Sequence, residues 1–177
     1  MGTASVQRTA IIGFLAAAFI GNLVLILSQP RTTHALPDPG DKRAALERLA
    51  SRKVSSYSDL TGAAAAAGLR LSRRFVGIVD GIIRIDERQV TIAGWLVDTD
   101  GDGTPLDVAV FVGGTMVGAA ATQGEWPGVA ESVRLGFGAD KNVAFRFSFP
   151  CRAGDQPVVA GLGPKERYIP LRSSPCP

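Results

Sequence analysis

The chain has 177 residues, of which 46% are hydrophobic and 20% are charged, and its formal net charge is +3. This composition excludes a disordered chain, and the presence of one His and two Cys excludes a multi-histidine or four-cysteine zinc site. Residues 1–72 hold eight basic and four acidic residues, against 11 and 12 in residues 73–177. A nucleic-acid-binding domain concentrates positive charge on its folded part, so DNA and RNA are not expected as partners.

An uncharged apolar segment lies near the start of the chain. Residues 10–27 contain one polar side chain, that of Asn22. As a helix this segment would measure about 27 Å, close to the roughly 30 Å hydrocarbon core of a bilayer. The sequence therefore predicts a membrane anchor within residues 1–28. Two alternatives stay open, a secretory signal cleaved after Ala35 and a buried core helix.

Residues 29–72 are predicted to form a basic stalk rich in Pro and Ala. Prolines near its start favour an extended connector. A weakly amphipathic helix is predicted from Asp41, as its N-cap, to Val54, either solvated or in contact with lipid headgroups or a partner helix. Small polar residues are expected to interrupt the helical pattern at residues 55–61. The alanines of residues 62–68 predict a second short helix or a flexible spacer.

From Phe75 onward the hydrophobic pattern changes to the period of two that is typical of β-strands. Gly113 and Gly114 indicate a tight hairpin, because both central positions of a type I′ turn need positive φ. Segments rich in β-branched and aromatic residues predict the strands, which lie at residues 90–96, 107–112, 115–120, 143–149, 157–162 and 167–171.

The predicted fold class is mainly β. About seven short strands with no long helices between them predict that residues 73–177 form an antiparallel Ig-like β-sandwich. It is preceded by a single transmembrane helix and the partly helical stalk. Within the sandwich, Phe145, Phe147 and Phe149 alternate with polar residues and are expected to share a buried face. Residues 127–135 are predicted to form a helical turn with Pro127 near its start.

The two cysteines predict a disulfide. Cys151 follows the Phe-rich strand and Cys176 is the penultimate residue of the sequence. Their bond would close a loop of about 25 residues, which stabilises a fold by roughly 3 to 4 kcal/mol in the chain-entropy model. A disulfide behind a membrane segment places the domain outside the cytoplasm, although the count of basic residues flanking the segment mildly favours the opposite orientation.

An acidic loop is the one candidate for a metal site. Asp98, Asp100 and Asp102 alternate as the oxygen ligands of a calcium loop do, with Gly103 at the sixth position. The twelfth position, which in an EF-hand is a bidentate Glu, is Ala109. Because Asp and Gly are also ordinary loop residues, the calcium site and a solvated loop both remain open, and no other cofactor is expected.

No arrangement of residues indicates catalysis. A catalytic triad would have to use His34, and neither a phosphate-binding loop nor a recognisable acid pair is present. We therefore expect a protein that is not an enzyme. Of the two tryptophans, Trp95 on an apolar strand is expected in the core, whereas Trp126, between Glu125 and Pro127, is either a packing residue or a platform for a sugar ring.

The region from Val79 to Leu171 resembles a bacterial β-sandwich module that recurs beside glycosyltransferases and other surface-polysaccharide proteins. The signature of this module is Gly-Trp-x-x-Asp, matched here by Gly94, Trp95 and Asp98. The chain departs from the pattern at residues 126–128, where Arg-Pro-Asp is usual, and at Ala144, where Gly is usual. The resemblance implies the fold and an envelope-glycan setting but no catalytic residues. We expect Gly94, Trp95 and Asp98 to determine the fold.

These observations predict a membrane-anchored accessory or binding module that recognises a surface glycan or a protein of its assembly machinery. It would span the bacterial inner membrane once, with its C-terminal domain in the periplasm. The alternative is a structural subunit of a membrane complex, assembled through the stalk and a helix face formed by Gly13, Ala17 and Gly21.

Overall fold

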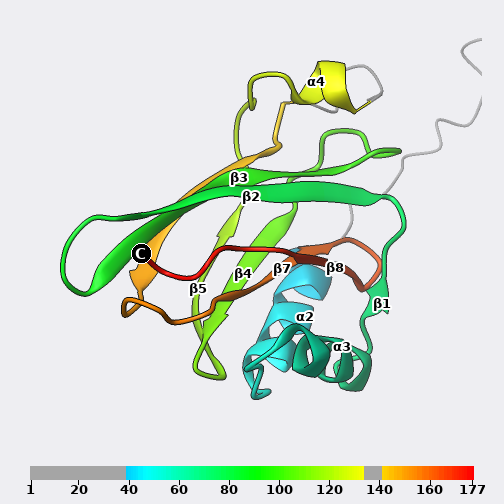
Figure 1. The fold of residues 1–177 in the computed structure, drawn as a ribbon. Coiled ribbons are helices and arrows are strands. Elements are labelled where there is room, and N and C mark those ends of the chain that lie inside the picture. The colour runs from blue at the N-terminus through cyan, green and yellow to red at the C-terminus, as the bar shows by residue number, and fades with distance from the viewer. Residues whose placement is uncertain (1–38, 134–140) are drawn as a thin grey trace, which may run out of the picture. The chain divides into compact units, whose positions relative to one another are not determined.

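The structure is a computed structural model that describes residues 39–133 and 141–177 (Figure 1). The predicted anchor, the site after Ala35 and the helix face of Gly13, Ala17 and Gly21 lie outside the described residues. Among the residues that are described, no helix is long and apolar enough to cross a membrane.

Two β-sheets form the body of the domain, which confirms a mainly β fold with two antiparallel-rich sheets. One sheet has five strands in the order β1-β8-β7-β4-β5, and the other has three in the order β2-β3-β6. All pairs are antiparallel except β1 with β8. The strands are β1 Arg70–Leu71, β2 Phe75–Arg84, β3 Gln89–Asp98, β4 Asp107–Val112, β5 Thr115–Ala121, β6 Ala144–Pro150, β7 Val158–Gly163 and β8 Arg167–Leu171.

A hydrophobic core fills the space between the two sheets. The three-stranded sheet contributes alternate residues of β3, including Ile92 and Leu96, and the predicted Phe face of β6 with Phe145 and Phe149. The five-stranded sheet contributes Val108, Val110 and Val159, among others. Since successive side chains of a strand point to opposite faces, Trp95 and Val97 of β3 face away from this core.

Two helices cover the other face of the five-stranded sheet. They are α2 Pro39–Ala50 and α3 Tyr57–Ala66, and Leu49 and Leu60 from them are fully buried against Phe111 and Tyr168 of the sheet (Figure 1). The chain from Pro37 to Pro177 accordingly forms one compact unit. The described part of the predicted stalk is therefore part of the folded unit, and the prediction of a solvated stalk helix was wrong. Burial on both faces also explains why β7, and β4 after Asp107, consist of apolar residues and glycine.

Both helices begin earlier than the sequence pattern indicated. The first starts at Pro39 instead of after Asp41, because the fixed φ of proline suits the first position of a helix. The second starts at Tyr57, inside the predicted interruption at residues 55–61. There Ser56 acts as the N-cap and its hydroxyl oxygen accepts a hydrogen bond of 3.1 Å from the backbone N–H of Asp59.

The predicted hairpin and helical turn are confirmed. Gly113 and Gly114 join β4 to β5 with φ values of +60° and +91°. Residues Val129–Ser132 form α4, a single turn just after Pro127, while residues 134 and 135 of the predicted turn lie outside the described residues.

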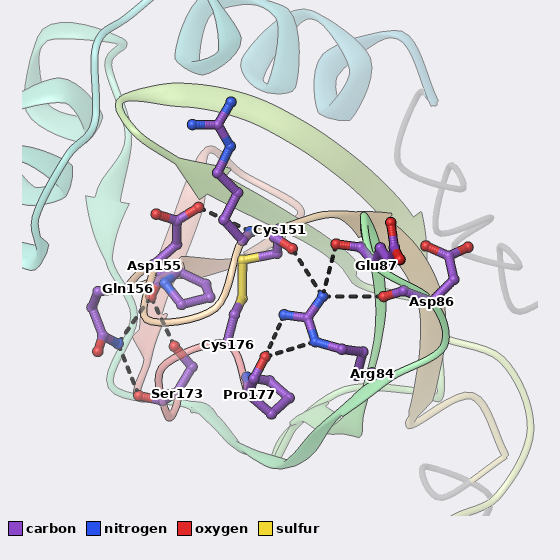
Figure 2. The surroundings of a disulfide bond; sticks show 11 residues. Arg84, Asp86, Glu87, Cys151, Asp155, Gln156, Ser173, Cys176 and Pro177 are labelled. Carbon is purple, nitrogen blue, oxygen red and sulfur yellow. Dashed lines mark hydrogen bonds between the residues drawn. A yellow bond between two sulfur atoms is a disulfide. The ribbon is translucent and has the colours of Figure 1, made fainter.

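The predicted Cys151–Cys176 disulfide is also present (Figure 2). It joins the end of β6, in the three-stranded sheet, to the tail that follows β8 in the five-stranded sheet. Beside it, the guanidinium group of Arg84 donates hydrogen bonds to the main-chain oxygens of Pro177, Asp86, Glu87 and Cys151. The tail is thus held to the three-stranded sheet both covalently and by hydrogen bonds.

Candidate functional site

A groove of about 700 Å³ lies beside the outer face of the three-stranded sheet. Its volume falls within the range of about 300 to 1,000 Å³ that is common for small-molecule sites. Alanines at the end of β5 and the start of β6 form part of its wall. The other residues that line it are Asp80, Gln123, Glu125, Trp126, Pro127, Phe145 and Arg146. We call it the Trp126 groove.

The loop that carries Trp126 is tied to the start of β6. Thr122, which is fully buried, accepts a hydrogen bond from the N–H of Leu106 and donates one to the carbonyl oxygen of Asn142. The carbonyl oxygen of Gly124 accepts bonds of 2.9 and 3.2 Å from the N–H groups of Val143 and Ala144. The loop is therefore held by the side-chain hydroxyl of Thr122 before Gln123 and by the main-chain oxygen of Gly124 after it.

Trp126 rests on a small hydrophobic cluster of its own. The buried members are Trp95, Val97, Val129 and Val143, and the half-buried Trp126 packs against them. The prediction that Trp95 is a core residue is thus confirmed, but it lies in this outer cluster and not between the sheets. Because the cluster supports Trp126 and the rest of the ring lines the groove, Trp126 presents a rigid aromatic surface at low entropic cost.

Polar side chains from three different segments surround this aromatic surface. Gln123 and Glu125 come from the same loop as Trp126, and Arg146 comes from the outer face of β6. Asp80 comes from a β-bulge in β2, where the pairing with β3 passes from Val79 to Gly81 and skips Asp80. Bulges commonly re-aim a side chain in this way. The groove thus offers an apolar platform with carboxylate, amide and guanidinium groups that accept and donate hydrogen bonds.

The acidic loop is organised by an arginine. The Nε atom of Arg74 lies 3.2 Å from Oδ1 of Asp98 and 3.0 Å from Oδ2 of Asp100. Asp102 accepts hydrogen bonds from the N–H and the hydroxyl group of Thr104. No group of three or more His, Cys, Asp or Glu in residues 39–133 and 141–177 could hold a metal ion. Each of the three carboxylates predicted as calcium ligands thus makes a contact within the protein.

The residues predicted as fold determinants make close structural contacts. The ring of Phe145 lies over Gly94, where a Cβ atom would be 2.7 Å from Cζ of Phe145 and would also collide with the carbonyl oxygen of Ile78. The aromatic side chain that packs against Gly94 is thus that of Phe145. Oδ1 of Asp98, at the start of the loop, accepts a hydrogen bond of 3.2 Å from the N–H of Asp100.

Sequence reasoning identified Trp126 but missed the polar residues around it. The alternation of β6 does place Arg146 opposite the Phe face, so its exposure could have been predicted. By contrast, no local pattern indicates that the β2 bulge brings Asp80 to the same groove, because this depends on strand order and register.

The chain was also compared with known proteins. No family model, curated protein or solved structure matches it.

Proposed function

We propose that the protein is a non-catalytic binding module that recognises a glycan through the Trp126 groove. The observation that carries this proposal is the half-buried ring of Trp126 on a rigid support, with carboxylate, amide and guanidinium groups beside it. A sugar ring has an apolar face and a rim of hydroxyl groups, so it suits an aromatic platform flanked by donors and acceptors. Clefts that bind small ligands combine these two features.

The setting that we propose is the bacterial cell envelope, with residues 10–27 as a single-pass anchor and the domain in the periplasm. The Cys151–Cys176 disulfide supports this setting, because such bonds persist in oxidising compartments. We further propose an Ig-like sandwich. Leaving out the short β1, the first, second and fifth strands form one sheet, and the seventh, sixth, third and fourth form the other. Ig-like folds divide their strands in a related way.

Binding of the full-length protein to an array of bacterial surface polysaccharides tests the proposal. We expect Trp126→Ala to weaken the binding of a recognised glycan by about tenfold or more, because truncated aromatic anchors commonly cost over 1.4 kcal/mol. Trp126→Phe, which keeps a ring, should retain most of the affinity. Glu125→Gln should weaken binding by removing a charged acceptor from the groove.

Glu131→Gln is the matched control, because Glu131 is exposed on α4 and does not line the groove. This variant should bind as the wild type does. Equal affinity of the wild type and Trp126→Ala would contradict the site. Cleavage of a bound glycan that is lost in Asp80→Asn would show that the groove is catalytic and contradict a purely binding role.

A further inference from the structure

Strand β2 is an edge strand. It lies at one end of the three-stranded sheet and pairs only with β3. Among the described residues, the main chain of Val76 to Arg84 makes no backbone hydrogen bond outside that pairing. On the side away from β3, about nine residues of extended chain thus make no backbone hydrogen bond, and β8 comes close to part of the strand. Unpaired edges of this length are templates for a further strand.

The outer face of this edge strand is apolar and exposed. Val76, Ile78, Ile83 and Ile85 have between 38% and 69% of their surfaces accessible, and with Leu71 they make up the large exposed hydrophobic side chains among the described residues. Val76 and Ile78 lie opposite Val97 and Trp95, and Ile83 lies opposite Thr91, so all three share the outer face of the sheet. Ile85 continues their alternation beyond the end of the strand.

The bulge at Asp80 selects one antiparallel register for pairing with a second copy of the strand. Before the bulge the outward residues are even-numbered, and after it they are odd-numbered, because one residue is skipped. In antiparallel pairing of two identical strands, the numbers of opposite residues have a constant sum. A sum of 161 places Val76 opposite Ile85 and Ile78 opposite Ile83. In this register each pair joins either two outward-facing or two inward-facing residues. A regular strand has this property at every even sum, whereas the shift at Asp80 leaves β2 with the sum of 161 as the register that keeps like faces opposite along the whole strand.

The centre of this pairing also fits sterically. With a sum of 161, Asp80 lies opposite Gly81 of the other strand. Gly81 has no atom within 4 Å of where a Cβ would lie, so space is available beside it. Asp80 itself is exposed and lines the Trp126 groove. The occupant that matches the edge in both side-chain pattern and space is therefore a second copy of the same strand.

We propose that the protein forms a homodimer in which β2 pairs antiparallel with β2 of a second copy, about a twofold axis between Asp80 and Gly81. The two three-stranded sheets then become one continuous six-stranded sheet. Such an interface is isologous, which means that each contact between two residues occurs twice, once on either side of the twofold axis. The proposal does not depend on the nature of the ligand in the Trp126 groove.

Cysteine cross-linking of the full-length chain tests the register. Two differently tagged chains, one with Ile78→Cys and one with Ile83→Cys, are expressed together and treated with a mild oxidant. We expect a disulfide-linked dimer that carries both tags, because directly opposite residues lie about 4.5 to 5.5 Å apart between Cα atoms. Either variant alone should give no link, because its two cysteines would be five residues out of register, about 16 Å apart.

A disruptive variant tests the dimer independently. Ile83→Lys should raise the dimer dissociation constant by about tenfold or more, since it replaces an apolar cross-strand pair with a charge beside an apolar side chain at two places in the dimer. Its thermal unfolding should stay cooperative because position 83 is exposed. Leu71→Lys, at an exposed apolar residue outside β2, should leave the dimer intact. The readout is molecular mass by light scattering.

Two outcomes would overturn the proposal. In the first, the wild type stays monomeric at every protein concentration measured and the mixed sample gives no cross-link. The bulge would then protect the edge from pairing. Cross-links in the single-variant samples at the same yield as in the mixture would show that the chains do not associate in this register.

Discussion

At the scale of single residues, Gly94 leaves room for the ring of Phe145, which lies opposite it on β6. The ring of Phe145 occupies the space that a side chain at position 94 would need. Phe145 in turn is almost completely buried in the core between the sheets. The glycine of the Gly-Trp pair is therefore required for packing, while the tryptophan next to it, on the opposite face, supports the Trp126 groove.

Replacing this glycine should destabilise the domain. We expect Gly94→Ala to lower the free energy of unfolding by about 2 kcal/mol, because the added methyl group overpacks a rigid core against an aromatic ring and a carbonyl oxygen. Urea denaturation measures the change. Gly62→Ala is the control: no atom lies near its added methyl group, and alanine is the better helix former, so it should be neutral or stabilising. An equal loss in both variants would contradict this account.

At the scale of elements, α2 and α3 are structural parts of the domain. They convert one face of the five-stranded sheet from solvated to buried, and hydrogen bonds from α2 reach the connections around β1 and β8. Arg48 on α2 donates to the carbonyl oxygen of Ala67 and forms an ion pair of 3.0 Å with Glu166. The pair is half exposed and adds little stability, so the apolar contacts carry the attachment.

Truncating a buried leucine of α3 should therefore unfold the sheet and not only the helix. We expect Leu60→Ala to reduce the free energy of unfolding by about 2 to 5 kcal/mol, the range for a buried leucine. Leu71→Ala, at a residue that is 61% exposed, should change it by less than about 0.5 kcal/mol. Circular dichroism at a wavelength dominated by strands follows the transition. A loss of helical signal that leaves the strand transition unchanged would mean that the helices are dispensable.

Strand β2 shows how one local irregularity serves two surfaces. The same bulge brings Asp80 into the Trp126 groove and changes the side-chain parity on which the proposed dimer depends. In such a dimer the two grooves would lie on the same face of a continuous sheet. Two sites on one rigid body raise the avidity for a repeating polymer without any new contact.

At the scale of the whole molecule, the disulfide connects the two sheets near the C-terminal end of the described chain. Cys151 and Cys176 are separated by 25 residues that include β7 and β8. The bond therefore restricts the unfolded chain over a loop that contains two strands of the five-stranded sheet. Arg84 adds non-covalent contacts to the same tail (Figure 2).

Removing the disulfide should lower global stability. For the double variant Cys151→Ser/Cys176→Ser we expect a loss of about 3 kcal/mol in the free energy of unfolding, since a loop of this size then regains its entropy in the unfolded state. Guanidinium denaturation measures the loss, and the wild type under a reducing agent should show a similar one. An unchanged denaturation midpoint in both samples would indicate that the tail contributes nothing to global stability.

The sequence by itself determined the features that depend on neighbouring residues. Alternation identified the Phe face of β6, Gly113 and Gly114 identified the hairpin through their need for positive φ, and the two cysteines left one intramolecular pairing. Each of these signals acts over a few residues or through covalent chemistry, so it can be read without knowing the rest of the fold.

Only the tertiary structure decided what the helices cover and which side chains form the Trp126 groove. The helical stripe around Leu49 is too narrow to distinguish a solvated helix from a packed one, and its burial follows from the apolar outer face of β4 and β7. Likewise, Asp80 and Arg146 are 66 positions apart in the sequence. Both line the groove because their strands, β2 and β6, are the two neighbours of β3 in one sheet. Strand order and register are set by the burial of the whole core, which no local segment of the chain encodes.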